Sequence, residues 1–373
     1  WIKNNPIPAD QASWSTYGKL YVDNQRYLWG ILQELASNSG QRSAGQAQLG
    51  DYFAACMNID AIDQAGTGPL QAELAAIEQL QDRAGLAGLV GELIRSSDTN
   101  NYFLALGSQQ DAEDATQTIG AVFAGGLGLP DRDYYLADTP DRKAILDAYR
   151  EHVTAMFELL GVQRDQAVDS AAVVLAIESR LAKATLTLVE RRDPYNTYHR
   201  MSLAELQKMI HVFDWSKFFQ SVGLQTEPWI NVSQPVFLLE MQSVIEQQSI
   251  QNLKTYLRWA LLNTRAELLS QPFRDQHFAF FSKRLRGIDQ QRPRWRTCTS
   301  LVDQQLGEAL GREFVERNFP PQVRDDVKRM AVQMQQAMAE RIDSLGWMSA
   351  ETREQAHDKL QKMRDKIGYP DQW

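Results

Sequence analysis

The five histidines are the side chains best suited to hold a catalytic metal, but their spacing does not fit a zinc peptidase. Such an enzyme places two histidines at positions i and i+4 of one helix, with a glutamate between them as the general base. No histidine of this chain has another histidine four positions away. Glu151 precedes His152, yet the residue four positions further on is Met156. We therefore interpret all five as surface or core residues: His152, His199, His211, His277 and His357.

The glycine-rich stretch GGLGLPDRDYY, residues 125–135, is the next candidate for binding chemistry. It lacks the G-x-G-x-x-G spacing of a dinucleotide site and the Gly-Lys-Ser/Thr of a P-loop. Asp131, Arg132 and Asp133 could form an acid pair with a cation. We favour a structural role, in which they cap and bridge nearby backbone above Tyr134 and Tyr135. With no G-x-S-x-G motif either, the residues alone show no catalytic constellation.

The chain has two cysteines, Cys56 and Cys298. They could be separate thiols buried in a core. They could also form one disulfide, which would imply an oxidising compartment. Neither has a recognisable partner histidine for catalysis, and their positions alone do not decide between the first two roles.

Composition excludes two broad classes of function. The 373 residues carry a net charge of −8 and the pI is about 5.3, with no basic stripe, which argues against nucleic acid as a partner. No apolar run approaches the length of a membrane-spanning helix. No signal peptide is visible, but the chain opens inside a motif, so this says nothing about the native start.

The elements that would position these residues are predominantly helical. Apolar residues recur at helical spacing over 16–37, 139–160, 165–186 and 250–270. The clearest pattern covers 320–345, where methionines recur and are expected to fill a core. Ser349 predicts the cap of a further helix. Short apolar runs at 102–106, 229–232 and 235–239 are candidate strands. We predict a mainly α fold, one large multi-helix lobe with few short strands, without a linker or repeat.

Several stretches together resemble the neprilysin family of zinc metallopeptidases, which includes endothelin-converting enzyme and the bacterial PepO peptidases. They are WIKNNPIPAD, DYFAACMN, GGLGLPDRDYY, RRDPYNTYHRMSLAEL, FDWSKFF, and the run from WRTCTSLVDQQ to KIGYPDQW. Their order and rough spacing also match, so the resemblance covers essentially the whole chain. The residues that carry its structural motifs are Trp1, Pro8, Gly126, Gly128, Pro130, Asp131, Arg132, Asp133, Tyr134, Gly368, Tyr369 and Pro370.

The resemblance implies that this chain is the N-terminal, non-catalytic part of a two-lobed zinc metalloendopeptidase. H-E-x-x-H, the third zinc ligand in E-x-x-x-D and the late histidine of the family do not occur here. The implied enzyme binds one zinc ion in its C-terminal lobe and cleaves short peptides in an enclosed chamber. This chain would hold no catalytic and no metal-binding residue. Residues 1–15 would lead in from the catalytic lobe, 16–365 would form the lid and access domain, and 366–373 would begin the connection back.

The resemblance also bears on the cysteines. The cysteines at the matching places are disulfide-bonded in the extracellular members of the family, which favours a Cys56–Cys298 bond and a periplasmic or secreted protein. Membrane contact would come only from an anchor preceding Trp1. Ser13 stands where some relatives have an arginine that shapes the substrate end of the chamber, so any preference resting on that arginine is in doubt.

The alternative is a stand-alone, non-enzymatic helical binding module. Large apolar residues stand at both ends of the chain, Trp1 and Trp373. Since a natural module should end in polar segments, these residues favour a fragment of a larger enzyme.

Overall fold

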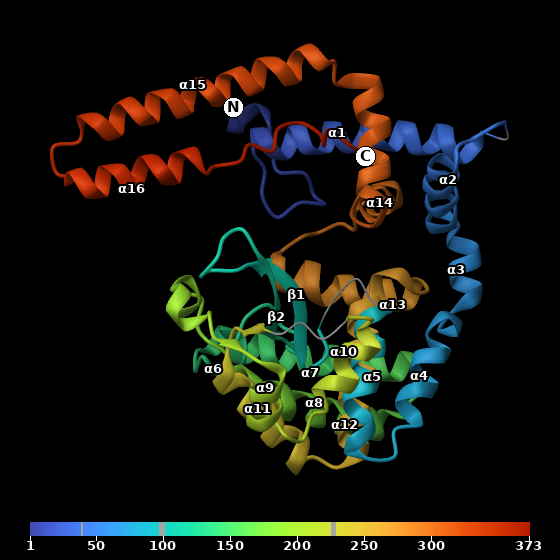
Figure 1. Cartoon of the computed structure of the whole chain (residues 1–373). Helices are drawn as coiled ribbons and strands as arrows, with labels where there is room; N and C mark the ends of the chain where they lie inside the picture. Colours follow the sequence, from blue (N-terminus) through green and yellow to red (C-terminus); the bar gives the residue numbers. More distant parts are fainter. Residues whose placement is uncertain (39, 97–100, 225–228) are drawn as a thin grey trace. The chain divides into compact units, whose positions relative to one another are not determined.

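The computed structural model describes residues 1–38, 40–96, 101–224 and 229–373 (Figure 1). These residues form two compact units. Unit 1 comprises Trp1–Asn58 and Arg292–Trp373, and unit 2 comprises Ile59–Gln291. The fold is mainly α, as the sequence predicts.

The chain divides into two units although no linker marks the boundary in the sequence. The chain leaves unit 1 where one helix ends at Met57 and the next begins at Ile59. Because only one residue separates the two helices, the sequence contains no Gly-, Ser- or Pro-rich linker that would mark the boundary. The functional division into 1–15, 16–365 and 366–373 stays a prediction.

Three helices form the core of unit 1: α1 (Thr16–Ser37), α2 (Ala44–Met57) and α14 (Arg294–Asn318). The predicted helix over 16–37 is therefore confirmed. Ser15 caps α1 by accepting a hydrogen bond from the Gly18 amide at 3.0 Å. Such a bond satisfies one of the free amides of a first turn. The buried residues shared by these helices are Ile31, Leu32, Leu35, Leu49, Phe53, Cys298, Val302 and Leu310.

Unit 1 also contains a helical pair, α15 (Pro321–Ser344) and α16 (Ala350–Gln361), and a short 3-10 helix η1 (Ile2–Asn4). Pro321 occupies the first turn of α15, where its missing amide costs no hydrogen bond. Ser349 caps α16 through the Thr352 amide at 3.1 Å. Both helices lie where the sequence predicts them.

The apolar stripe of α15 does not fill a core, contrary to the prediction. Met330, Met334 and Met338 are 57%, 66% and 52% exposed. The half-buried positions of α15 are instead 324, 326, 328, 331, 335 and 339, which carry arginine, aspartate, lysine, alanine, glutamine and alanine. The spacing identified an apolar face correctly, but a periodic pattern does not say what covers that face.

Unit 2 is a larger helical body with one sheet. The predicted helices at 139–160, 165–186 and 250–270 correspond to α7 (Pro140–Leu159), α8 (Arg164–Ala184) and α12 (Ile250–Arg265). The α-helices are α3 (Ile59–Ala65), α4 (Gln71–Glu78), α5 (Leu86–Arg95), α6 (Asp133–Leu136), α7 (Pro140–Leu159), α8 (Arg164–Ala184), α9 (Leu203–Met209), α10 (Trp215–Val222), α11 (Pro235–Gln247), α12 (Ile250–Arg265) and α13 (Gln271–His277). Short 3-10 turns (Gly68–Leu70, Arg83–Gly85, Glu190–Arg192, Pro194–Asn196, Ala266–Leu268) and a π-helix (Phe278–Arg284) complete it.

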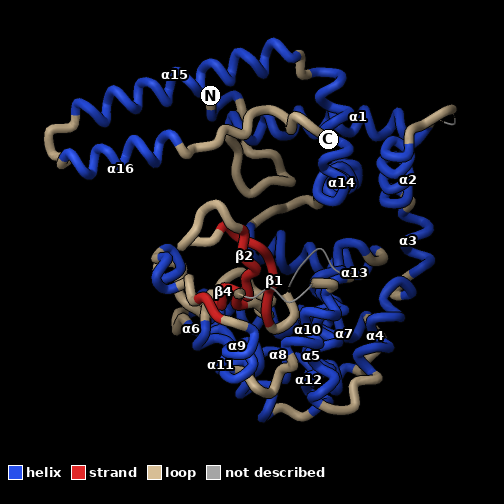
Figure 2. The backbone as a smooth tube through the Cα atoms, viewed as in Figure 1, coloured by secondary structure: helices blue, strands red, loops and turns tan. Residues whose placement is uncertain are grey.

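The sheet has the order β1-β2-β4-β3, and Figure 2 shows it in red. β1 (Leu104–Gln110) and β2 (Thr118–Ala124) form an antiparallel hairpin. β4 (Ile230–Val232) lies parallel to β2 and antiparallel to β3 (Arg200–Met201). The predicted strand at 229–232 is confirmed, and the one at 102–106 begins two residues later and is longer.

The strand predicted at 235–239 is wrong, because these residues open α11. Pro235 stands in its first turn, which suits a helix start. The buried positions continue at helical spacing as Phe237, Leu238, Met241, Val244 and Ile245. A short apolar run does not distinguish a strand from the start of a buried helix.

Candidate functional site

The most buried histidine, His152, lies among aromatic rings, and one of them is the imidazole of His277, with ring centroids 6.4 Å apart. His152 is 1% exposed and stacks on Phe280 with ring centroids 5.0 Å apart. The Gln276 side chain lies 3.2 Å from Nδ1, while Nε2 has no hydrogen-bond partner. Burial lowers the pKa of His152 to about 3, so the ring is neutral at physiological pH. Within the described ranges, no three His, Cys, Asp or Glu side chains are grouped to hold a metal.

The glycine-rich motif wraps over a buried polar cluster in unit 2. Gly126 has φ +77°, and a Cβ there would lie 2.2 Å from the Tyr256 hydroxyl oxygen. That hydroxyl donates to the Gly126 carbonyl at 2.8 Å. The Asn101 side chain accepts from the Gly126 amide at 2.6 Å. Only a residue without a side chain permits this approach and this backbone conformation.

Glu178 of α8 lies at the centre of the cluster and is 1% exposed. Its carboxylate accepts hydrogen bonds from the hydroxyls of Tyr135 and Tyr149, at 2.8 and 2.9 Å, and from the Trp259 indole at 3.0 Å. The Gly128 backbone amide is a further donor. Desolvation raises the pKa of Glu178 to about 7, although these hydrogen bonds partly oppose the shift.

Glu178 is not among the residues predicted from the sequence, although the sequence contains a signal for it. It lies four residues after Val174 and three before Leu181, on the buried face of α8. An acid on the apolar face of a helix indicates a buried, hydrogen-bonded carboxylate.

The charged residues of the motif bind backbone and each other. Asp131 accepts from the Asp133 amide at 3.0 Å and pairs with Arg191 at 3.3 Å. Arg132 donates to the Thr185 carbonyl. The Arg132 guanidinium also lies 3.8 Å from the Asp133 carboxylate. These contacts join the loop to neighbouring backbone and to nearby charged side chains.

The remaining motif residues of this loop have simple surroundings. The Arg142 guanidinium lies 4.0 Å from the centre of the Tyr134 ring, a cation–π contact. Pro130 is exposed. The motif is thus an ordered loop that packs over the buried polar cluster of unit 2.

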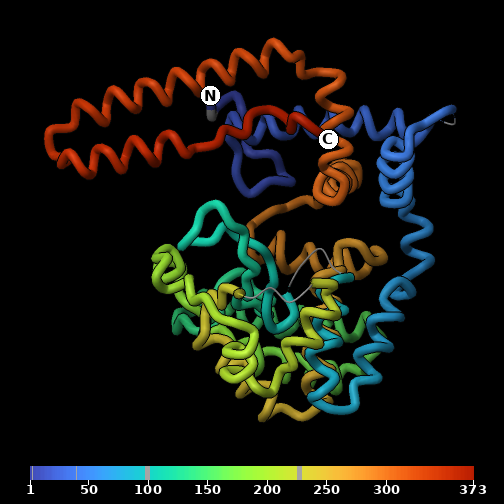
Figure 3. Tube along the Cα trace, in the orientation of Figure 1, coloured from blue at the N-terminus to red at the C-terminus, as the bar shows by residue number. Residues whose placement is uncertain are grey.

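Cys56 and Cys298 form a disulfide in unit 1, joining α2 to α14 with their Cα atoms 5.7 Å apart. The two helices lie side by side, α2 in blue and α14 in orange in Figure 3. The Arg294 guanidinium adds hydrogen bonds of 2.9 and 2.8 Å to the Cys56 carbonyl. Both segments of unit 1 are thereby fastened together.

The N-terminal segment is anchored on α14 by a buried cation. Arg296 is 5% exposed, pairs with Asp10 and donates to the Gln25 side chain at 3.1 Å. Trp1 and Pro8 contribute backbone carbonyls, which accept from Asn4 at 3.0 Å, Asn5 at 2.9 Å and Gln11 at 2.9 Å. Ser13 is exposed.

The C-terminal motif folds back on α15. Gly368 has φ +75°, and Tyr369 lies beneath the Arg324 guanidinium at 4.4 Å. Arg324 also donates to the Tyr369 carbonyl at 2.9 Å. Pro370 follows, and the Trp373 ring stacks on Tyr369 with centroids 6.2 Å apart. The segment after α16 is therefore ordered by unit 1 itself.

The exposed stripe of α15 is the strongest candidate for a functional surface in unit 1. It consists of Val323, Val327, Met330, Met334 and Met338, all exposed. These residues recur at three or four positions, so they share one helix face. A continuous exposed apolar face of this kind is a candidate interaction surface. We call it the α15 stripe.

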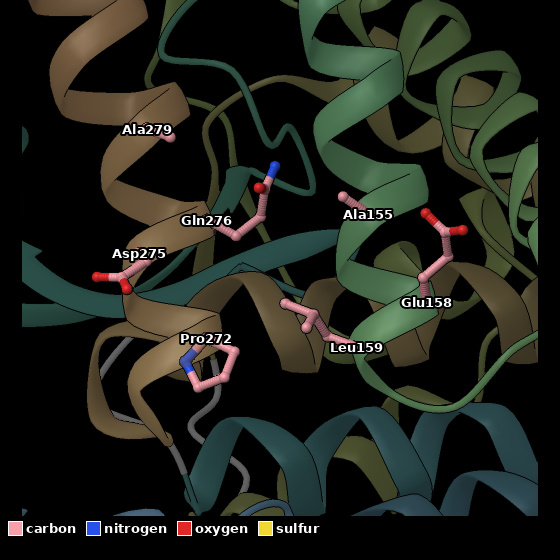
Figure 4. Close-up of a pocket in the computed structure, with 7 residues that line it drawn as sticks. All are labelled: Ala155, Glu158, Leu159, Pro272, Asp275, Gln276 and Ala279. Carbon is pink, nitrogen blue, oxygen red and sulfur yellow. The ribbon is translucent and has the colours of Figure 1, made fainter.

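Unit 2 has a cavity of about 520 Å³ between α7 and α13 (Figure 4). Its two acids are already engaged. Glu158 pairs with Arg164 at 2.8 Å. Asp275 accepts from Gln271 and Gln291 at 2.6 and 2.8 Å. Neither carboxylate of this cavity is therefore free to act as an acid, a base or a metal ligand.

Comparisons with known proteins place the whole chain in one family. The model of peptidase family M13 matches residues 1–370. Neprilysin-3 of Drosophila melanogaster is 28% identical over 391 residues, covering 100% of this chain and 49% of the relative. Endothelin-converting enzyme 1 of Mus musculus is 27% identical over 388 residues, covering 99% and 49%.

A solved structure gives the same result. The inhibitor complex of the Mycobacterium tuberculosis zinc metalloprotease ZMP1 matches with a TM-score of 0.90 and 28% identity, covering 97% of this chain and 54% of that one. The chain thus spans about half the length of the curated relatives it matches. Because the family model extends over nearly every residue, the chain belongs to peptidase family M13.

Proposed function

We propose that this chain is the N-terminal part of a zinc-dependent metalloendopeptidase that hydrolyses short peptides in an enclosed chamber. The chain supplies the lid and access lobe, and a C-terminal lobe carries out catalysis. Membership of peptidase family M13 and the half-length match to its relatives support this division. The proposal places one zinc ion in the C-terminal lobe, as the family resemblance implies.

The α15 stripe is the observation that carries the proposal. Three methionines of one helix face are more than half exposed, while the polar neighbouring face is half-buried within unit 1. A helix that turns its apolar face to water is stabilised when a partner covers that face. The C-terminal lobe is the partner we propose.

The lid role gives this lobe a physical task. A lobe that closes over a reaction chamber excludes folded proteins by size and removes water from around the substrate. In this proposal the residues of the chain select substrates by access, and none of them touches the reacting atoms.

We further propose an extracytoplasmic location, in the periplasm or outside the cell. The Cys56–Cys298 bond supports it, because such bonds persist in oxidising compartments. Within the described ranges, no helix combines the length and the apolar character needed to span a membrane.

The test uses the full-length protein. We expect one equivalent of zinc by metal analysis, cleavage of short unstructured peptides, and loss of that activity with phenanthroline and its return with added zinc. A folded protein substrate should remain intact. Chelator-insensitive cleavage, or a gene product without a catalytic lobe, would overturn the peptidase proposal and favour a helical binding module. Efficient digestion of a folded protein would overturn the lid role alone.

A further inference from the structure

A second cavity of unit 2 lies against the sheet and has a different character from the one between α7 and α13. Its volume is about 580 Å³. Its walls come from β1, β2 and β4 and from the ends of α5, α9 and α10. Cavities of this size hold drug-sized ligands in other proteins.

The cavity is hollow because the sheet presents small residues at its floor. Gly120 of β2 pairs directly with Ser108 of β1, and both line the cavity. A Cβ added at Gly120 would meet only the Ile230 side chain, at 3.7 Å. A larger side chain there would therefore project into empty space. Since successive residues of a strand face opposite sides, Gln109 lies on the other face of the sheet.

The walls are apolar and partly open to water. Phe219, Val222 and Leu203 line the cavity together with Leu224 and Trp229, which are 51% and 43% exposed. An apolar ligand that covers this exposed apolar surface removes it from water, and this burial favours binding.

One charge distinguishes this cavity. Among the described residues that line it, Arg95 is the only charged one. Arg95 ends α5 and is exposed, at the water-facing rim. A guanidinium beside an apolar hollow suits a ligand with one carboxylate, since arginine matches the geometry of that group.

We propose that this cavity binds a small molecule with an apolar body and a single carboxylate, one per chain. Two sources have this chemistry: a fatty acid, and the C-terminal residues of an apolar peptide. The site consists of unit 2 residues, and its proposal does not depend on the proposed peptidase activity.

The experiment is calorimetric titration of the full-length, chelator-treated protein with octanoate and with N-acetyl-Leu-Phe. Octanol and the amide of the peptide are the uncharged comparators. We expect one site per chain and at least about tenfold weaker binding of the uncharged partner, the usual loss for a charged hydrogen bond. Arg95→Ala should remove that difference, and Arg95→Lys should retain part of it.

Two variants test the location. Gly120→Val and Ser108→Leu each fill the hollow from neighbouring strands and should abolish binding. Gln109→Val changes the opposite face and should bind like the wild type. Tighter binding of octanoate identifies a lipid source, and tighter binding of the peptide identifies a peptide terminus. Absence of binding of both probes would overturn the proposal, as would unchanged binding in folded Gly120→Val and Ser108→Leu proteins.

Discussion

At the scale of single residues, Glu178 and the glycine-rich motif stabilise each other. Its carboxylate is surrounded by hydroxyl, indole and backbone donors, and the motif supplies one of them through Gly128. The motif therefore satisfies a buried acid while the acid fixes the loop. A buried acid needs such donors, because an unpaired one would cost several kcal/mol.

We predict that Glu178 makes the stability of the protein depend on pH. Its folded pKa of about 7 exceeds its ordinary value of 4.5, so folding takes up a proton between these values. The contribution of Glu178 to the free energy of unfolding is therefore largest below pH 4.5 and decreases as the pH rises towards 7. The total decrease is about 3 kcal/mol. Glu178→Gln should remove that slope. Urea unfolding of both proteins at several pH values measures it.

The control for this prediction is Glu92→Gln, an exposed acid of α5. It should leave the pH slope of the wild type in place. A Glu178→Gln protein with the wild-type slope would show that Glu178 keeps one ionisation state in the folded and unfolded chain.

Gly128→Ala should destabilise the protein by about 1 to 3 kcal/mol, the usual cost of overpacking a filled core. A Cβ at this position would lie 1.8 Å from the Tyr149 hydroxyl oxygen. The matched change Gly30→Ala lies inside α1, where nothing is within 4 Å of the added atom. It should raise stability by roughly 1 kcal/mol through helix propensity. Equal effects of the two changes in thermal or urea unfolding would contradict the packing shown here.

At the scale of elements, α15 is a regular helix whose apolar face, the α15 stripe, is exposed to water in the described structure. α15 lies between residues 321 and 344 as its sequence periodicity predicts. Within unit 1 only Ile342 of this helix is fully buried. The exposed face is the one that we propose to contact the C-terminal lobe.

Replacing Met334 and Met338 by glutamate should leave the packing of α15 within unit 1 intact and disturb only the proposed contact with the C-terminal lobe. In the chain of 373 residues, exposed substitutions should change the free energy of unfolding by no more than about 0.5 kcal/mol. In the full-length protein the charges would enter the proposed interface, so kcat/KM for peptides should fall by at least about tenfold. Steady-state kinetics measures this. Gln336→Glu, on the opposite face of α15, is the control, and an equal loss of activity there would remove the stripe from the interface.

At the scale of the whole molecule, the disulfide joins two segments of unit 1 that are separated by all of unit 2. Cys56 and Cys298 are 242 positions apart, and Ile59–Gln291 lies between them. In the chain-entropy description, closing such a long loop stabilises the folded state by restricting the unfolded one.

The Cys56→Ser/Cys298→Ser protein should lose about 2 to 5 kcal/mol of stability. The loss should appear in unit 1, and hydrogen exchange of unit 2 amides, such as those of α8, should change less than that of α2 and α14. In the wild type, thiol titration under denaturing, non-reducing conditions should find no free thiol. Two free thiols in protein handled without reductant would contradict both the bond and the oxidising location.

The sequence by itself determined the helical class, most long helices and the family. Segments such as 16–37 and the helix capped by Ser349 depend on apolar spacing and a local side-chain cap, which are properties of nearby residues. The cysteine pair followed from resemblance, because spacing along a chain does not measure distance in space.

Only the tertiary structure decided the remaining features. It turned 235–239 into a helix start, left the α15 stripe exposed and enclosed Glu178 between a distant loop and three helices. It also brought Gly120, Ser108 and Arg95 to one hollow. Each outcome depends on which remote surface covers a residue, and burial sets both the energy of an apolar face and the pKa of an acid. Local periodicity carries no information about that remote surface.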